Sequence, residues 1–149
     1  MKKVMLIVCC VVGALAFISA DRNTSSNSEM TLEGVWELQH QFLYENNVVR
    51  DTIMNLNGYR QVKIYTKGKV MWTRFNPADS NEWFGYGTYE VKDGKLVEQL
   101  EYASDAMMRI VDTVQVFRFD LDLGKDRYSQ IVLDKNGDPE SSENYTRLE

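Results

Sequence analysis

Strict alternation of side-chain type between Gly34 and Tyr44 is the feature that most constrains how this chain can fold. Large, mostly aromatic side chains fall on one side of the alternation, at Trp36, Leu38, His40, Phe42 and Tyr44. The intervening positions are mostly polar. A period of two residues is typical of a β-strand with one buried face. A single strand cannot bury that face by itself, so the rest of the chain is expected to supply further strands that cover it.

Short segments bounded by turn residues follow throughout the rest of the sequence. We predict strands at 59–65, 69–75, 83–91, 112–123, 127–133 and 142–148, with a further strand directly after Asp93-Gly94. Residues 46–58 alternate poorly and are predicted to form a long connection, which could cover an opening, form a short extra strand or form a helical turn. No helix of ten residues is predicted. The pattern favours an all-β, eight-stranded antiparallel up-and-down barrel, because closure removes both exposed sheet edges.

The turn at residues 66–69 has two possible geometries. A two-residue turn would place Ile64 opposite Met71, whereas a three-residue turn would shift this pairing by one residue. Such a shift reverses which side chains face the interior. We favour an arrangement in which Val62, Ile64 and Trp72 face inward.

The Asp93-Gly94 dipeptide is the strongest hairpin signal in the chain. A two-residue turn there pairs Val91 with Leu96, Tyr89 with Glu98, Gly87 with Leu100, and Gly85 with Tyr102. This register carries most apolar side chains of both strands, together with Glu98, onto one face. An inward carboxylate needs a hydrogen-bond donor, for which Tyr89 and Tyr102 are the candidates.

The first twenty residues have the layout of a secretory signal peptide. Two lysines precede an apolar run at 4–18, which ends at the small residues Ser19 and Ala20. The run is shorter than the ~20 residues needed to span a bilayer. We therefore predict cleavage after Ala20, export to the periplasm or the extracellular space, and no membrane span in the mature protein. An uncleaved anchor and a lipid-modified cysteine are the alternatives. Residues 21–31 are predicted to form a flexible tether, and 32–149 the barrel domain.

Charge and cysteine content narrow the possible partners. Loss of the leader would change the net charge from −5 to −7, because the leader contains two lysines and no acidic residue. An acidic surface argues against nucleic acids and anionic membranes as partners. Both cysteines also lie in the leader, so the mature chain can form no disulfide or cysteine-based site. The remaining length suits one domain with a single core, which we expect to be monomeric.

The opening Gly34-Val35-Trp36, at the start of the first of eight meander strands, resembles the Gly-x-Trp signature of lipocalins and the wider calycin group. In those proteins a basic residue late in the chain packs across the tryptophan at the closed end of the barrel. The resemblance implies that Arg147 is this partner of Trp36. The layout of residues 32–149 is also similar to small lipocalin-like domains secreted by Gram-negative gut bacteria. The chain lacks the other loop motifs and the C-terminal helix of longer lipocalins, which argues against a deep apolar calyx.

An eight-stranded barrel either fills its interior with side chains or leaves space for one small ligand. The small residues Gly85 and Gly87 favour space. The candidate ligand-binding residues are His40, Phe42, Trp72, Tyr89, Glu98, Tyr102, Phe117 and Phe119. We therefore expect an exported protein that binds a small apolar or amphipathic molecule in the barrel and performs no chemistry.

Two other functions are compatible with the sequence. One is a structural or protein-interaction module with a filled barrel. The other is an enzyme that uses Glu98, and His40 with it, as acid and base. No metal site or cofactor is predicted, because His40 is the only histidine and has no neighbouring ligands at metal spacing. A calcium loop that begins at Asp134 would need glycine at its sixth position and glutamate at its twelfth, but these positions are Pro139 and Tyr145. The segment 134–138 is therefore predicted to form a hairpin turn.

Overall fold

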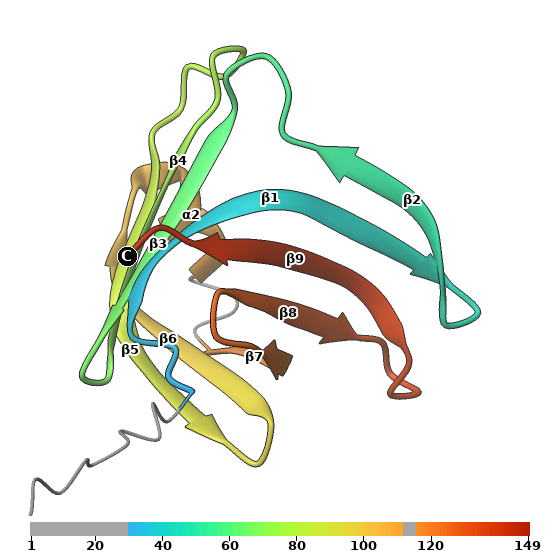
Figure 1. The fold of residues 1–149 in the computed structure, drawn as a ribbon. Helices are drawn as coiled ribbons and strands as arrows, with labels where there is room; N and C mark the ends of the chain where they lie inside the picture. Colours follow the sequence, from blue (N-terminus) through green and yellow to red (C-terminus); the bar gives the residue numbers. More distant parts are fainter. Residues whose placement is uncertain (1–29, 112–115) are drawn as a thin grey trace, which may run out of the picture.

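The computed structural model describes residues 30–111 and 116–149, which form nine strands and one short helix (Figure 1). The elements, in chain order, are β1 (Gly34–Glu45), β2 (Val48–Met54), β3 (Arg60–Thr66), β4 (Lys69–Phe75), β5 (Trp83–Lys92), β6 (Lys95–Ala103), α2 (Asp105–Val111), β7 (Val116–Leu123), β8 (Arg127–Leu133) and β9 (Pro139–Arg147). The predicted leader (1–20), most of the predicted tether (21–29) and the start of the predicted strand 112–123 lie outside the described residues.

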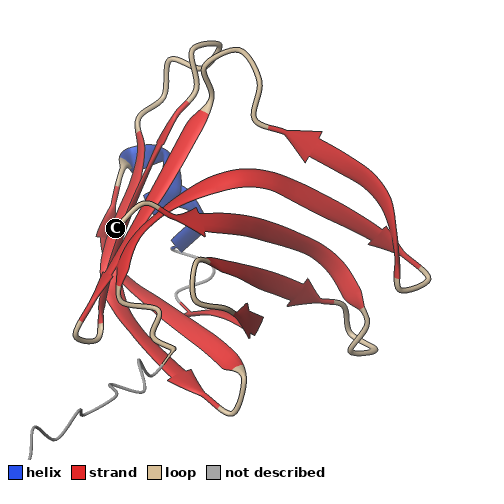
Figure 2. Cartoon of the chain, in the orientation of Figure 1, coloured by secondary structure: helices blue, strands red, loops and turns tan. Residues whose placement is uncertain are grey.

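All the strands belong to one antiparallel sheet in the order β2-β1-β3-β4-β5-β6-β7-β8-β9, and β1 also pairs with β9. Along one of its edges, β1 pairs with two strands in turn: residues 34–37 pair with β3, and residues 40–45 pair with β2. Eight strands, β1 and β3 to β9, therefore close into a barrel. The remaining strand, β2, pairs with the second half of β1 and lies apart from β3 (Figure 2). The all-β, antiparallel, up-and-down architecture is confirmed.

The strand count differs from the prediction because β2 forms within the predicted connection 46–58. Its hairpin depends on Asn46 and Asn47, whose φ angles of 52° and 61° lie in the left-handed region. This two-residue turn places Glu45 opposite Val48. Asparagine tolerates the left-handed conformation better than most residues, so the pair of asparagines is a turn signal that sequence reasoning could have used.

The turn between β3 and β4 has the two-residue geometry, with Ile64 opposite Met71. The prediction that Val62 and Ile64 face inward is wrong, because Ile64 is 41% exposed. The buried side chains of β3 are instead the polar Gln61, Lys63 and Tyr65. Trp72 lies opposite Lys63 and is buried as expected.

The Asp93-Gly94 turn gives the predicted register over most of the β5–β6 hairpin: Val91 pairs with Leu96, Tyr89 with Glu98, and Gly87 with Leu100. Beyond Gly87, a bulge at Glu101 places Tyr86 opposite Tyr102. The predicted inward position of Tyr102 is therefore wrong. Its side chain is 56% exposed and stacks on Tyr86 with ring centroids 5.2 Å apart.

A second bulge changes the orientation of β1. Leu38 pairs with Tyr145, but His40 pairs with Asn144, which leaves Gln39 as an extra residue. A bulge places two residues against one and so reverses the alternation beyond it. Gln41 then lies opposite Glu143 on the inner face, while His40, Phe42 and Tyr44 face outward. The prediction that this whole aromatic series shares one face with Trp36 is wrong after Leu38.

Two apolar clusters lie inside the barrel. The first closes one end and contains Leu32, Trp36, Leu38, Tyr65, Val70, Leu96, Tyr128 and Tyr145. The second contains Trp72, Leu100 and Met107. Met107 belongs to α2, which begins after Ser104: the Ser104 hydroxyl accepts a hydrogen bond from the Met107 backbone N–H at 3.4 Å. The short helix thus supplies part of the second cluster. Each large buried side chain contributes about 1.5–3 kcal/mol to folding.

Candidate functional site

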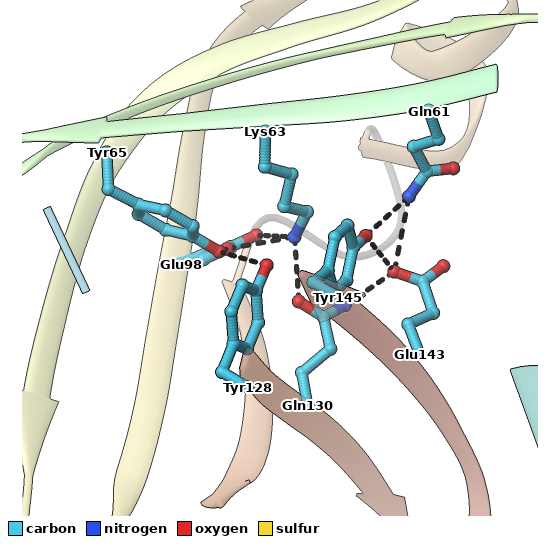
Figure 3. Close-up of polar contacts among 8 residues, drawn as sticks. All are labelled: Gln61, Lys63, Tyr65, Glu98, Tyr128, Gln130, Glu143 and Tyr145. Atoms are coloured by element: carbon cyan, nitrogen blue, oxygen red, sulfur yellow. Dashed lines mark hydrogen bonds and ion pairs between the residues drawn. The ribbon is translucent and has the colours of Figure 1, made fainter. Parts of the chain in front are cut away.

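A network of polar side chains crosses the barrel interior (Figure 3). Three members, at alternating positions 61, 63 and 65, come from the same face of β3. The complete set is Gln61, Lys63, Tyr65, Glu98, Tyr128, Gln130, Glu143 and Tyr145. The remaining members come from β6, β8 and β9, so four strands of the barrel meet in this network.

The network contains a buried ion pair between Lys63 and Glu98. Lys63 Nζ lies 3.0 and 3.1 Å from the two carboxylate oxygens, and the side chains are only 5% and 4% exposed. Lys63 also donates to Gln130 Oε1 at 2.8 Å, and the Tyr65 hydroxyl donates to Glu98 Oε1 at 2.5 Å. These bonds offset the cost of removing two charges from water. Glu98 is therefore buried with its partners already in place.

Sequence reasoning identified Glu98 but not its partners. A tyrosine does donate to the carboxylate, but it is Tyr65 rather than Tyr89 or Tyr102. Lys63 was missed because the strand around it was assigned the opposite orientation. In the sequence, Gln61, Lys63 and Tyr65 alternate with the apolar Val62 and Ile64. This alternation is equally compatible with either set of side chains facing the interior.

Glu143, which is half-buried, is the second acidic centre of the network. Its Oε2 atom accepts hydrogen bonds from Gln61 at 3.2 Å, Gln130 at 2.9 Å and the Tyr145 hydroxyl at 2.5 Å. The other oxygen, Oε1, accepts none from the described residues, and the contacts of Glu143 drawn in Figure 3 all end at Oε2.

The tyrosine hydroxyls of the network are held in their protonated form. Burial raises the pKa of Tyr65, Tyr128 and Tyr145 well above the usual value. Loss of solvation is the largest cause for all three, and the carboxylates of Glu98 and Glu143 add to it. These phenols are therefore hydrogen-bond donors across the physiological pH range.

An interior cavity of about 140 Å³ lies between the polar network and the second apolar cluster. Its lining residues are Gln61, Lys63, Trp72, Arg74, Glu98, Leu100, Met107, Phe117, Phe119, Gln130 and Glu143. Four of the predicted ligand-binding residues are among them: Trp72, Glu98, Phe117 and Phe119. The cavity has an apolar side and a charged side, which is the arrangement that an amphipathic molecule requires.

A larger pocket of about 530 Å³, here called the mouth pocket, lies outside this cavity. It is lined by Gln41, Ile53, Met54, Asn55, Leu56, Asn57, Tyr59, Arg74, Asn76, Pro77 and Ala78. Arg74 is the residue that lines both spaces. The mouth pocket exists because β3 separates from β1 after Glu37, where β2 takes over the edge of β1.

Arg74 is held by stacking rather than by an ion pair. Its guanidinium carbon lies 4.7 Å from the centroid of the Trp83 ring. The Trp83 indole N–H in turn donates to Asp79 Oδ2 at 2.7 Å. The pKa of Asp79 lies below its usual value, mainly because the Asn81 backbone N–H and the Trp83 indole donate to it. The Arg74 Nε atom is buried and has no hydrogen-bond partner among the described residues.

The other four predicted ligand-binding residues do not line the cavity. Tyr89 is half-buried and packs edge-on against Tyr65 near the closed end, with ring centroids 4.9 Å apart. Tyr102 is exposed because of the bulge in β6. His40 and Phe42 face outward with rings 4.6 Å apart because of the bulge in β1.

Trp36 and Arg147 lie opposite each other at the closed end of the barrel. The Arg147 guanidinium carbon is 4.0 Å from the centroid of the Trp36 ring, and Trp36 is completely buried. The same guanidinium donates to the backbone carbonyls of Lys125, Glu33 and Thr31 at 2.6–2.8 Å. Arg147 thus ties the chain segment before β1 to the end of β9.

Comparison with solved structures supports the same architecture. The chain is similar to a lipocalin-like protein from Bacteroides uniformis, with a TM-score of 0.53 at 13% sequence identity over 78% of this chain and 98% of that one. The fold is lipocalin-like. An uncharacterized protein from Bacteroides eggerthii gives the same TM-score of 0.53, at 14% identity over 79% of this chain and 100% of the other. No family model and no curated protein matches the sequence.

Two further properties concern only the described residues. No helix within 30–111 and 116–149 is long and apolar enough to cross a membrane. The same residues contain no cluster of three or more histidine, cysteine, aspartate or glutamate side chains arranged to hold a metal ion.

Proposed function

We propose that this lipocalin-like protein is exported and binds one small amphipathic molecule in the interior cavity, without chemistry. The observation that carries the proposal is the cavity itself, which joins the apolar Trp72, Leu100 and Phe117 to charged groups on its opposite side. Its volume of about 140 Å³ is close to that of an engineered cavity of about 150 Å³ that binds benzene. The mouth pocket, which shares Arg74 with the cavity, offers a path of entry.

Export is part of the proposal and is supported by the sequence of the first twenty residues. The charged start, the apolar run at 4–18 and the small residues at its end match a cleavable leader. N-terminal sequencing of the mature protein is expected to begin at Asp21. A membrane-retained protein that begins at Met1 would contradict export.

A filled-barrel interaction module is the second candidate. The saturated Lys63–Glu98 pair favours it, because much of the interior is occupied by side chains that satisfy one another. An enzyme that uses both Glu98 and His40 has less support. Glu98 is buried among Lys63 and Tyr65, whereas His40 faces outward on β1, so the two cannot act together on one molecule in the cavity.

Ligand binding can be tested by filling the cavity. Leu100→Phe adds volume to a side chain that lines it, whereas Val91→Phe adds the same ring on the exposed part of the same hairpin. We expect small amphipathic molecules to change tryptophan fluorescence through Trp72 and to raise the melting temperature of wild type and Val91→Phe. Leu100→Phe should lose both responses. Absence of both responses in wild type, for a panel of small apolar acids, amines, alcohols and amino acids, would favour the filled-barrel module.

A further inference from the structure

We propose that the ligand is a small zwitterion with a compact apolar group, an apolar α-amino acid being the simplest example. Arg74 would bind its carboxylate and Glu143 its ammonium group. This inference rests on the proposed function, because it assigns a ligand class to the same interior cavity.

The charges that line the cavity are balanced but only partly paired. Two are cationic, Lys63 and Arg74, and two are acidic, Glu98 and Glu143. Lys63 and Glu98 neutralise each other at 3.0 Å. No ion pair within the described residues involves Arg74 or Glu143. Arg74, whose charge also acts on the neighbouring Tyr59 hydroxyl, and Glu143 are therefore one positive and one negative group in the same small space that have no ion-pair partner among the described residues.

Arg74 is suited to bind a carboxylate. Its buried Nε has no partner among the described residues, which is unfavourable unless a ligand or water supplies an acceptor. Stacking on Trp83 fixes the plane of the guanidinium, and Asp79 fixes Trp83. The planar fork of arginine donors matches the two oxygens of a carboxylate. No ion pair joins Arg74 to Asp79 within the described residues, although the Arg74 charge is near enough to contribute to the lowered pKa of Asp79.

Glu143 is suited to bind an ammonium group. Three donors hold its Oε2 atom, while Oε1 accepts no hydrogen bond from the described residues (Figure 3). A purely anionic ligand would bring a second negative charge into the cavity with Glu143. A purely cationic ligand would bring a second positive charge into the cavity beside Arg74. A zwitterion pairs with both groups and keeps the cavity neutral, so it avoids the cost of an unpaired buried charge.

The opposite side of the cavity limits the size of the apolar group. Trp72, Leu100, Met107 and Phe117 form this side. The volume of about 140 Å³ admits a group on the scale of benzene. A branched aliphatic side chain such as that of leucine has the required shape.

Three isosteric probes separate the contributions of the two charges: L-leucine, 4-methylpentanoic acid, which lacks the amine, and 3-methylbutylamine, which lacks the carboxylate. Isothermal titration calorimetry on the mature wild-type protein should show leucine binding about tenfold or more tighter than either partial probe. Equal affinity for leucine and one partial probe would overturn the zwitterion assignment while leaving a small-molecule function intact.

Two variants assign the charges to residues. Glu143→Gln should reduce the preference for leucine over 4-methylpentanoic acid by about tenfold, and Arg74→Met should reduce its preference over 3-methylbutylamine by a similar factor. Glu101→Gln, which changes an acid in an exposed ion pair, is the matched control and should alter neither preference. Melting curves establish that each variant folds. If Glu143→Gln does not fold, Arg74→Met decides alone, and unchanged leucine affinity in it would overturn the proposal.

The remaining outcomes separate this inference from the proposed function. If neither leucine nor any other amino acid of the panel binds but one of its acids, amines or alcohols does, the zwitterion assignment is wrong and the small-molecule function stands. If neither the probes nor the panel bind, both proposals are wrong.

Discussion

The two ends of the barrel are built from the same strands but differ in side-chain packing and in the hydrogen bonding of their buried polar groups. At the closed end, Tyr128 stacks on Tyr145 with ring centroids 4.6 Å apart and packs edge-on against Trp36 at 4.9 Å. At the mouth, β2 is exposed along its whole length, and the buried Nε of Arg74 has no hydrogen-bond partner in the part of the chain that the structure describes. One strand, β1, contributes to both ends, and the bulge at Gln39 separates its two parts. The closed end is organised for packing, and the mouth retains groups that a ligand could use.

Truncation at the closed end should have the largest effect. Trp36→Ala is expected to lower the free energy of unfolding by about 3–5 kcal/mol, because it removes a completely buried indole. Phe75→Ala, at the mouth end of β4, is the contrasting change and should cost no more than about 0.5 kcal/mol, since Phe75 is 64% exposed. Urea unfolding measures both. Similar losses for the two variants would show that the ends do not differ in packing.

The same experiment tests the closed-end pair. A double-mutant cycle of Trp36→Ala with Arg147→Ala is expected to show a coupling free energy of about 0.5–2 kcal/mol, from the guanidinium stacked on the indole. A coupling of zero would mean that Arg147 acts only through the backbone carbonyls that it contacts.

The layer between the two ends can be tested through its buried ion pair. Lys63→Met should cost about 3–5 kcal/mol, because it leaves Glu98 buried without its cation. The double variant Lys63→Met with Glu98→Leu should recover part of this loss, since no charge then remains unpaired. Lys69→Met breaks the exposed pair with Glu101 and serves as the control, with an expected cost below about 1 kcal/mol. Equal costs for the buried and exposed pairs in urea unfolding would contradict the assigned burial.

The bulge in β6 is expected to require glycine at the facing position. A Cβ atom at Gly87 would lie 2.0 Å from the Gln99 carbonyl oxygen, so Gly87→Ala must shift the backbone. We expect a loss of about 1–3 kcal/mol in the free energy of unfolding. Gly124→Ala, whose Cβ would meet its nearest neighbour at 3.4 Å, should cost less than about 0.5 kcal/mol. If both substitutions are tolerated equally, the close approach at Gly87 is not a constraint on the hairpin.

The buried tyrosines predict a loss of stability at high pH. Their pKa values are raised in the folded protein, so between the unfolded value near 10 and the folded value the unfolded chain releases protons that the native protein retains. Titration of these tyrosines therefore does not change the free energy of unfolding below about pH 10. Above this pH the free energy of unfolding should fall, by at most about 1.4 kcal/mol per pH unit for each tyrosine. Tyr128→Phe should make this fall less steep in melting curves recorded between pH 9 and 11. An unchanged slope would contradict the proposed titration of Tyr128.

Local chemistry was enough to predict the class of fold. The Asp93-Gly94 turn has positive φ at both residues, as its sequence favours, and it sets the predicted register of its hairpin up to Gly87. The Lys67-Gly68 turn also has positive φ at both residues, but the sequence left its geometry open. The alternation from Gly34 to Leu38 correctly indicated a strand with Trp36 buried. Glu98 was placed inside for the same local reason, since its strand follows directly from a well-defined turn.

The composition of the candidate site depended on contacts between distant parts of the chain. Lys63 is buried because Glu98, 35 positions away, meets it in the interior. Its own strand pattern would fit either face. His40 and Phe42 left the predicted inner face because the pairing of β1 with β9 inserts Gln39 as an extra residue.

What the sequence determined by itself is thus the all-β class, the number and place of most strands, and the register of the Asp93-Gly94 hairpin up to Gly87. The Asn46-Asn47 hairpin and the geometry of the 66–69 turn were decided by the structure. Only the tertiary structure decided which face of each strand is buried after a bulge, which charges pair inside the barrel, and that Arg74 joins the interior cavity to the mouth pocket. The physical reason is the period of two in a β-strand. A turn depends on the conformational preferences of two residues, but a single bulge, stabilised by the neighbouring strand, exchanges the inner and outer faces of every residue that follows it.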